Sequence, residues 1–141
     1  MPTYGFGAEL RFPNKNLNNT GVSHFFPCSG DYENPAGYTV DGVFQLYEYC
    51  MKHVSFSGPT YFAPLIKEIV QATKTSYLAN PETYTILLIL TDGDIHDMQE
   101  TKDWIVEGSE LPLSIIIIGI GDANFDRMVE LDSDDQVVSF K

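Results

Sequence analysis

Residues 86–97 constrain the fold of this chain most strongly, because an apolar run ends there abruptly in a group of carboxylates. The segment, ILLILTDGDIHD, passes from five aliphatic residues and Thr91 to Asp92, and further aspartates follow at 94 and 97. A continuous apolar run of strand length without alternation predicts a strand that is buried on both faces, as in a parallel sheet. The acidic half then lies where this strand leaves the sheet.

The second half of the chain alternates apolar strands with amphipathic helices. Strands are predicted at residues 84–90 and within LPLSIIIIGIG. Helices are predicted within SFSGPTYFAPLIKEIVQATKTSYL, MQETKDWIVEGSE and NFDRMVELD. This order predicts an α/β fold that is doubly wound, with a mostly parallel sheet flanked by helices. Because ligands bind outside the carboxyl ends of strands in such sheets, Asp92 and Asp94 are expected at the functional edge.

Shorter elements are predicted in the first half. Strands are expected at residues 3–8 and 22–28, joined by a loop rich in Asn, Pro and Gly. A helix is expected within YTVDGVFQLYEYCMKHV, where the apolar residues have amphipathic spacing: Val40, Val43, Phe44, Tyr47 and Met51. A length of 141 residues predicts one domain spanning residues 1–141.

The charge of the chain limits its partners. Eight basic and twenty acidic residues give a formal net charge of -12. A nucleic acid or an anionic bilayer would therefore be repelled on average, whereas a cation or a basic protein surface would be attracted.

The two cysteines and the apolar runs predict a soluble, cytoplasmic protein. Cys28 and Cys50 form no CxxC pair and have no histidine at zinc-ligand spacing, and one disulfide between them stays open. The apolar runs are far shorter than the roughly 20 residues of a membrane span. We also expect no secretory leader at the N-terminus.

The acidic group after residue 91 has two interpretations. Asp92, Asp94 and Asp97 could offer oxygen ligands to a hard cation such as Mg²⁺, and Gly93 permits a sharp turn or the close approach of a ligand. The same residue types are ordinary in turns and helix caps, and Asp94 or Asp97 could cap the following helix. No histidine stands with a Ser or Cys in a nucleophile motif, so no catalytic residue is predicted.

Several segments together resemble the von Willebrand factor type A domain of the copines. They are YGFGAEL, VSHFFP, GPTYFAPLIKEIV and the long stretch from YTILLILTDGDIHDM to SIIIIGIGDANFDRMVELDSDD. The same module occurs in a plant-type family of RING ubiquitin ligases, but DM at residues 97–98 and ELDSDD at residues 130–135 are closer to the copines.

The resemblance implies a protein-binding module with a metal-ion-dependent adhesion site for Mg²⁺ or Mn²⁺. In the family, that site combines a DxSxS or DxTxS motif, a threonine that opens a helix and an aspartate after a later strand. Thr60 matches the threonine and Asp92 matches the aspartate. Intracellular proteins would bind at the carboxyl ends of the strands.

The first ligand motif is not found before YGFG, so the chain is expected to be truncated at its N-terminus. It would then lack the first central strand and helix of the domain, leaving an incomplete metal site that binds its ion weakly or not at all. Unpaired strand edges would favour self-association. Copines bind phospholipid membranes in response to calcium through two other modules, so this chain is not expected to bind lipid itself.

Two alternatives stay open. The chain could be the substrate-recruiting domain of a RING-type ubiquitin ligase, although its own cysteines and histidines cannot form a RING. It could also be a degenerate scaffold that has lost the metal site.

Overall fold

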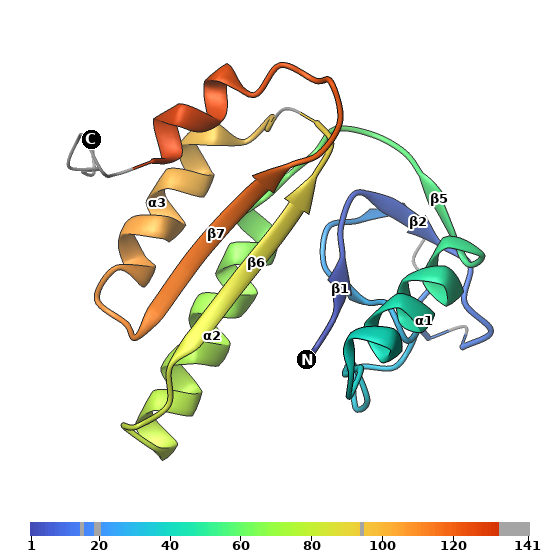
Figure 1. Cartoon of the computed structure of the whole chain (residues 1–141), viewed down its shortest axis with the longest axis horizontal. Helices are drawn as coiled ribbons and strands as arrows, with labels where there is room; N and C mark the ends of the chain where they lie inside the picture. Colours follow the sequence, from blue (N-terminus) through green and yellow to red (C-terminus); the bar gives the residue numbers. More distant parts are fainter. Residues whose placement is uncertain (15, 19–20, 94, 133–141) are drawn as a thin grey trace. The chain divides into compact units, whose positions relative to one another are not determined.

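The computed structural model describes residues 1–14, 16–18, 21–93 and 95–132. The chain divides into two compact units, Met1–Pro59 and Thr60–Lys141. Each unit has its own helices and strands (Figure 1) and its own buried side chains, and each is described by itself.

The first unit contains short antiparallel strands and one helix. Its strands are β1 (Tyr4–Gly5), β2 (Ala8–Leu10), β3 (Val22–Ser23), β4 (Phe26–Pro27) and β5 (Val54–Phe56). β1 pairs with β4, and a second sheet has the order β3-β2-β5. Helix α1 (Val40–Met51) begins at Thr39, whose hydroxyl accepts the backbone N–H of Gly42 at 3.0 Å. The predicted helix is therefore confirmed. The strand expected at residues 3–8 is divided into β1 and the start of β2, the strand expected at residues 22–28 is divided into β3 and β4, and β5 was not predicted.

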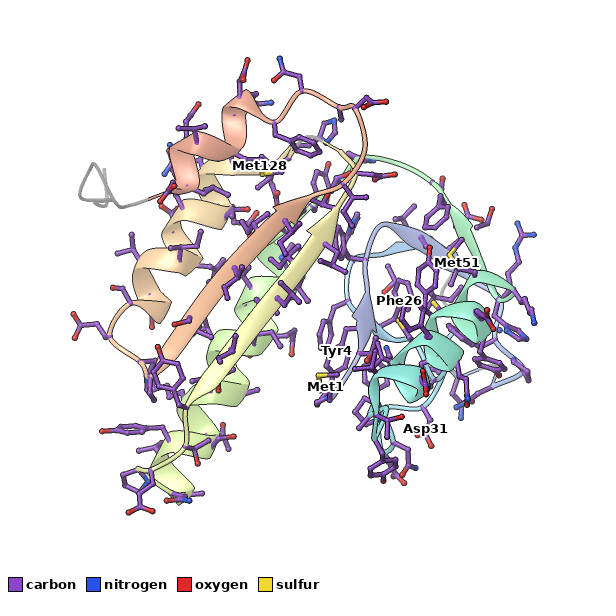
Figure 2. All side chains as sticks on the ribbon, viewed as in Figure 1. Met1, Tyr4, Phe26, Asp31, Met51 and Met128 are labelled. Carbon is purple, nitrogen blue, oxygen red and sulfur yellow. The ribbon has the colours of Figure 1, made fainter. Side chains whose placement is uncertain are left out.

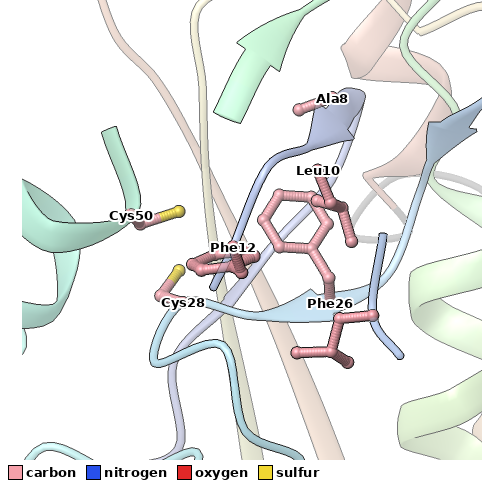
Figure 3. Close-up of a cluster of buried hydrophobic side chains, with 7 residues drawn as sticks. Ala8, Leu10, Phe12, Phe26, Cys28 and Cys50 are labelled. Carbon is pink, nitrogen blue, oxygen red and sulfur yellow. The ribbon is translucent and has the colours of Figure 1, made fainter. Parts of the chain in front are cut away.

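A small aromatic and aliphatic core holds the first unit together. Its buried members, most of which are drawn in Figure 3, are Ala8, Leu10, Phe12, Leu17, Phe26, Cys28 and Cys50. The two cysteines are free thiols, and Figure 3 shows their sulfurs facing each other. The hydrogen bond with Cys50, together with burial, raises the pKa of the Cys28 thiol, so this thiol stays protonated at neutral pH.

Helix α1 carries an apolar stripe that lies exposed. Cys50 is its buried residue, whereas Val40, Phe44, Tyr47 and Met51, the last labelled in Figure 2, are exposed. The amphipathic spacing thus predicted the helix correctly, but of the five side chains with this spacing only Val43 is half-buried, and the other four do not form the core of the first unit.

The second unit is built on two parallel strands and two helices. Its elements are α2 (Ala63–Ala79), β6 (Thr85–Thr91), α3 (Met98–Gly108), β7 (Leu113–Gly119) and the 3-10 helix η1 (Asp126–Leu131). β6 and β7 pair in parallel from Thr85 opposite Leu113 to Thr91 opposite Gly119. α2 and α3 lie on the same side of this pair (Figure 1).

A glycine allows the two helices to approach closely. A Cβ atom on Gly108 of α3 would lie 3.0 Å from a methyl group of Val70 on α2. Leu65, Ile66 and Val70 form the buried stripe of α2. The two closely packed helices together cover the inner face of the strand pair, on which Ile89 is 2% exposed.

The outer face of β6 and β7 is apolar and open to solvent, which corrects the prediction of a strand buried on both faces. Leu88 is 53% exposed, and Ile116, which lies opposite it in the register, is 48% exposed. Ile86, Leu90, Ile118 and Ile120 are exposed as well. The prediction failed because both helices pack on one side, so alternate residues of an unbroken apolar run face solvent.

The predicted fold class is confirmed as a mixture of helices and strands but is wrong about the sheet. The described strands form three small sheets, of which two are antiparallel and only β6–β7 is parallel. The apolar runs identify the parallel pair correctly. The short strands of the first half pair with one another in antiparallel ladders, and at two or three residues each they are too short for an apolar pattern to indicate their partners.

The exposed outer face predicts self-association. Six large aliphatic side chains, each at least 45% exposed, gather on this face, and such apolar patches mark association surfaces, so we expect the chain to sediment as a dimer or larger species. The double substitution Leu88→Lys with Ile116→Lys should shift it to the monomer, because it places charges at the centre of the patch. Leu78→Lys, at an exposed position of α2, is the matched control and should leave the association unchanged. Monomeric wild-type protein that unfolds cooperatively would contradict the prediction.

Candidate functional site

Two loops meet at the carboxyl end of β6, within the second unit. One loop precedes α2 and carries Thr60, and the other follows β6 and carries Asp92 and Gly93. A Cβ atom built on Gly93 would lie 3.8 Å from the Thr60 hydroxyl oxygen, which is van der Waals distance. The structure therefore brings together segments that are more than thirty residues apart in the sequence.

His96 joins the two loops through hydrogen bonds with Thr60. The backbone N–H of His96 donates to the carbonyl oxygen of Thr60 at 3.0 Å. In return, the backbone N–H of Thr60 donates to Nδ1 of His96 at 3.1 Å. Because Nδ1 accepts this bond, the imidazole carries its proton on Nε2.

Asp97 caps the helix that follows Thr60. One oxygen of its carboxylate accepts the backbone N–H of Phe62 at 3.0 Å, and the other accepts that of Ala63 at 2.8 Å. These two N–H groups lie at the start of α2, and N–H groups at a helix start have no acceptor within the helix itself. The side chain of Phe62, at the N-cap position, cannot provide one. A carboxylate from another loop therefore replaces the usual local cap.

A buried aliphatic side chain anchors the acidic loop that follows β6. Ile95 lies between two polar residues of the loop and is 0% exposed. Thr91, the last residue of β6, is buried, and its carbonyl oxygen accepts the backbone N–H of Ile120 at 2.8 Å. The exposed side chains of Asp92 and His96 thus lie on a loop that is held by a buried aliphatic residue and by the end of β7.

The predicted site residues have different outcomes. Thr60 and the segment that begins with Asp92 lie close together, although the assignment of either residue as a metal ligand stays a prediction. Asp94 lies outside the described residues. Asp97 occupies the N-cap position of α3 but makes no side-chain bond to cap it, because its carboxylate caps α2 instead.

Sequence analysis missed the roles of His96 and Asp97 in joining the loops. One signal for Asp97 was present: the segment PTYFAP places Tyr and Phe where a helix start ordinarily has Ser, Thr, Asp or Asn. A helix without a local cap needs an acceptor from elsewhere. No comparable signal identified His96, because its bonds depend on how the two loops meet.

The oxygen atoms at this site fit a hard cation only in part. The Thr60 hydroxyl has no hydrogen-bond partner among the residues that the structure describes, and Asp92 is exposed beside the loop junction. A hydroxyl and a carboxylate are suitable ligands for Mg²⁺, which commonly keeps several water ligands. Within the described part of the chain, no three His, Cys, Asp or Glu side chains gather at one point. A cation at this point would therefore keep most of its water ligands.

Comparison with known proteins identifies the family. The Copine family model matches residues 1–141. The chain belongs to the copine family. Copine-C of Dictyostelium discoideum is 40% identical over 134 residues, which make up 95% of this chain and 23% of that protein. Copine-A of the same organism is 42% identical over 135 residues, which make up 96% of this chain and 22% of that protein.

The copine resemblance seen in the sequence is thus confirmed, while the chain spans less than a quarter of the length of these relatives. The described helices include none with the length and apolar character needed to cross a membrane.

The geometry of Gly93 predicts that an alanine is tolerated there. Gly93 does not have a positive φ, and an added Cβ would make an ordinary contact with Thr60. Gly93→Ala should therefore change the free energy of unfolding by less than about 0.5 kcal/mol. Gly58, with φ at 80°, is the contrasting position, and Gly58→Ala should cost about 1–2 kcal/mol. Thermal unfolding of both variants tests this; equal losses would show that the loop geometry at Gly93 is wrong.

Proposed function

We propose that this chain is a non-catalytic protein-interaction module of the copine type. Its binding surface is the carboxyl end of β6 and the loop that precedes α2. The observation that carries the proposal is the meeting of the Thr60 loop with the loop that begins at Asp92, in a chain whose family is known. This end of a parallel strand pair is where open α/β folds bind their ligands.

The proposed ion is Mg²⁺ or Mn²⁺, bound weakly by Thr60 and Asp92. The hydroxyl and the carboxylate supply two oxygen ligands, and water supplies the others. The net charge of -12 favours the approach of a divalent cation. When bound, the ion would offer a coordination position to a carboxylate of the partner protein.

The proposed partners are intracellular proteins, and the proposed location is cytoplasmic. The unlinked thiols of Cys28 and Cys50 support a reducing compartment. The acidity of the chain argues against nucleic acid and against direct contact with anionic lipid. Membrane association would depend on other modules, and the alternative of a ubiquitin-ligase domain gains no support from the family assignment.

Titration with magnesium chloride tests the cation site. The amide signals of Thr60 and Gly93 in the ¹⁵N-labelled protein should shift, with saturation in the millimolar range because most ligands are water. Thr60→Ala and Asp92→Asn should each weaken binding about tenfold or more, because each removes one of the two protein ligands. Asp103→Asn, on an exposed carboxylate of α3 that accepts a bond from Gln99, is the matched control.

An absence of any magnesium response in the wild-type protein would contradict the cation site. The module would then be the metal-free scaffold that sequence analysis left open. Equal weakening by Asp103→Asn would instead point to a general effect of charge.

Site-specific photocrosslinking tests which end of the strands binds protein. A photoreactive residue at Asp122, which follows β7, should form adducts with other proteins in cell extract, and a chelator should reduce their yield. The same residue at Glu110, just before β7, should form fewer adducts, because it lies at the opposite end of the strand. Equal, chelator-insensitive adducts at both positions would contradict the proposed binding surface.

A further inference from the structure

We propose that Asp97 is the positioning residue of the candidate cation site: its carboxylate holds the Thr60 loop against the Asp92 loop and so sets the affinity for the ion. This inference rests on the proposed function, because it assigns a role toward the same ion. It concerns a residue that is not itself a ligand.

The carboxylate of Asp97 is committed to the start of α2. Its two oxygens accept the N–H groups of Phe62 and Ala63 at 3.0 and 2.8 Å. These bonds to an ionised group are stronger than bonds between neutral groups, and the positive end of the helix dipole strengthens them. Because Phe62 follows Thr60 by two residues, the position of Asp97 fixes the position of Thr60.

The orientation of the carboxylate is itself determined by a buried residue. Thr101, one helical turn further along the chain, is 0% exposed. Its hydroxyl donates to Oδ1 of Asp97 at 3.3 Å, and its backbone N–H donates to the carbonyl oxygen of Asp97 at 2.9 Å. Thr101 is buried on α3, so it links the rigid helix to the carboxylate that holds the loop.

The two bonds between His96 and Thr60 also join the loops, but they leave the start of α2 without an acceptor. The imidazole is exposed, so water competes for the bond from the Thr60 N–H to Nδ1. The Asp97 bonds are partly buried and join two elements of regular structure. Removal of the Asp97 carboxylate should therefore loosen the Thr60 loop, which then keeps only its bonds with His96, although α2 and α3 keep their packing around Val70 and Gly108.

Asp97→Ala and Asp97→Asn test the inference. In both variants we measure the dissociation constant for magnesium, by the amide shift of Gly93, at a temperature at which the protein is fully folded. Hydrogen exchange of the Phe62 and Ala63 amides is measured in the same samples. Val70→Ala is the matched control for lost stability, because it removes buried volume from α2 away from the loops. Asp103→Asn controls for lost charge.

Asp97→Ala should weaken magnesium binding about tenfold, as the loss of a group that orients a metal ligand typically does. It should also increase exchange at Phe62 and Ala63. Asp97→Asn keeps one acceptor oxygen and should fall between the wild type and Asp97→Ala in both measurements. Val70→Ala should lower the melting temperature yet leave the dissociation constant unchanged, so a purely structural role of Asp97 is distinguishable.

Unchanged magnesium affinity and unchanged exchange in Asp97→Ala would overturn the inference, as would equal weakening in Val70→Ala. Failure of the proposed function has a different signature, because the wild-type protein would then give no magnesium response at all. In that case the exchange at Phe62 and Ala63 alone decides whether Asp97 holds the loop.

Discussion

The hydrogen bonds from Phe62 and Ala63 to Asp97 determine the arrangement of the second unit around its candidate site. Helix α2 begins without a local cap, and the carboxylate that satisfies its first turn comes from the loop after β6. Together with the bonds between His96 and Thr60, these two bonds place Thr60 beside Gly93. One carboxylate thus stabilises a helix, joins two loops and brings a hydroxyl near the end of a strand.

The strand pair β6–β7 has two chemically distinct parts. Its outer face is aliphatic and exposed, whereas its carboxyl end is polar and acidic. The aliphatic face is suited to burial against another surface, because the gain on removing it from water grows with its area. The acidic end is suited to a hydrated cation. Self-association and cation binding would therefore use different parts of the same two strands and need not compete.

Sequence analysis predicted local structure better than it predicted pairing and burial. The apolar runs located β6 and β7, and the copine resemblance led to Thr60 and Asp92. The strands of the first unit are only two or three residues long, so no apolar pattern indicated how they pair. An unbroken run such as residues 86–90 does not reveal that only one face is covered. The role of Asp97 required knowing that the start of α2 lies next to the end of β6.

The most direct test of the central claim is a nuclear Overhauser measurement between the methyl group of Thr60 and the Cα protons of Gly93. The Thr60 hydroxyl and the position of a Gly93 Cβ are separated by 3.8 Å. Clear cross-peaks between the two residues in the folded protein are therefore expected, without added metal. Their absence, in a sample in which β6 and β7 still show their parallel register, would contradict the claim that these loops form one site.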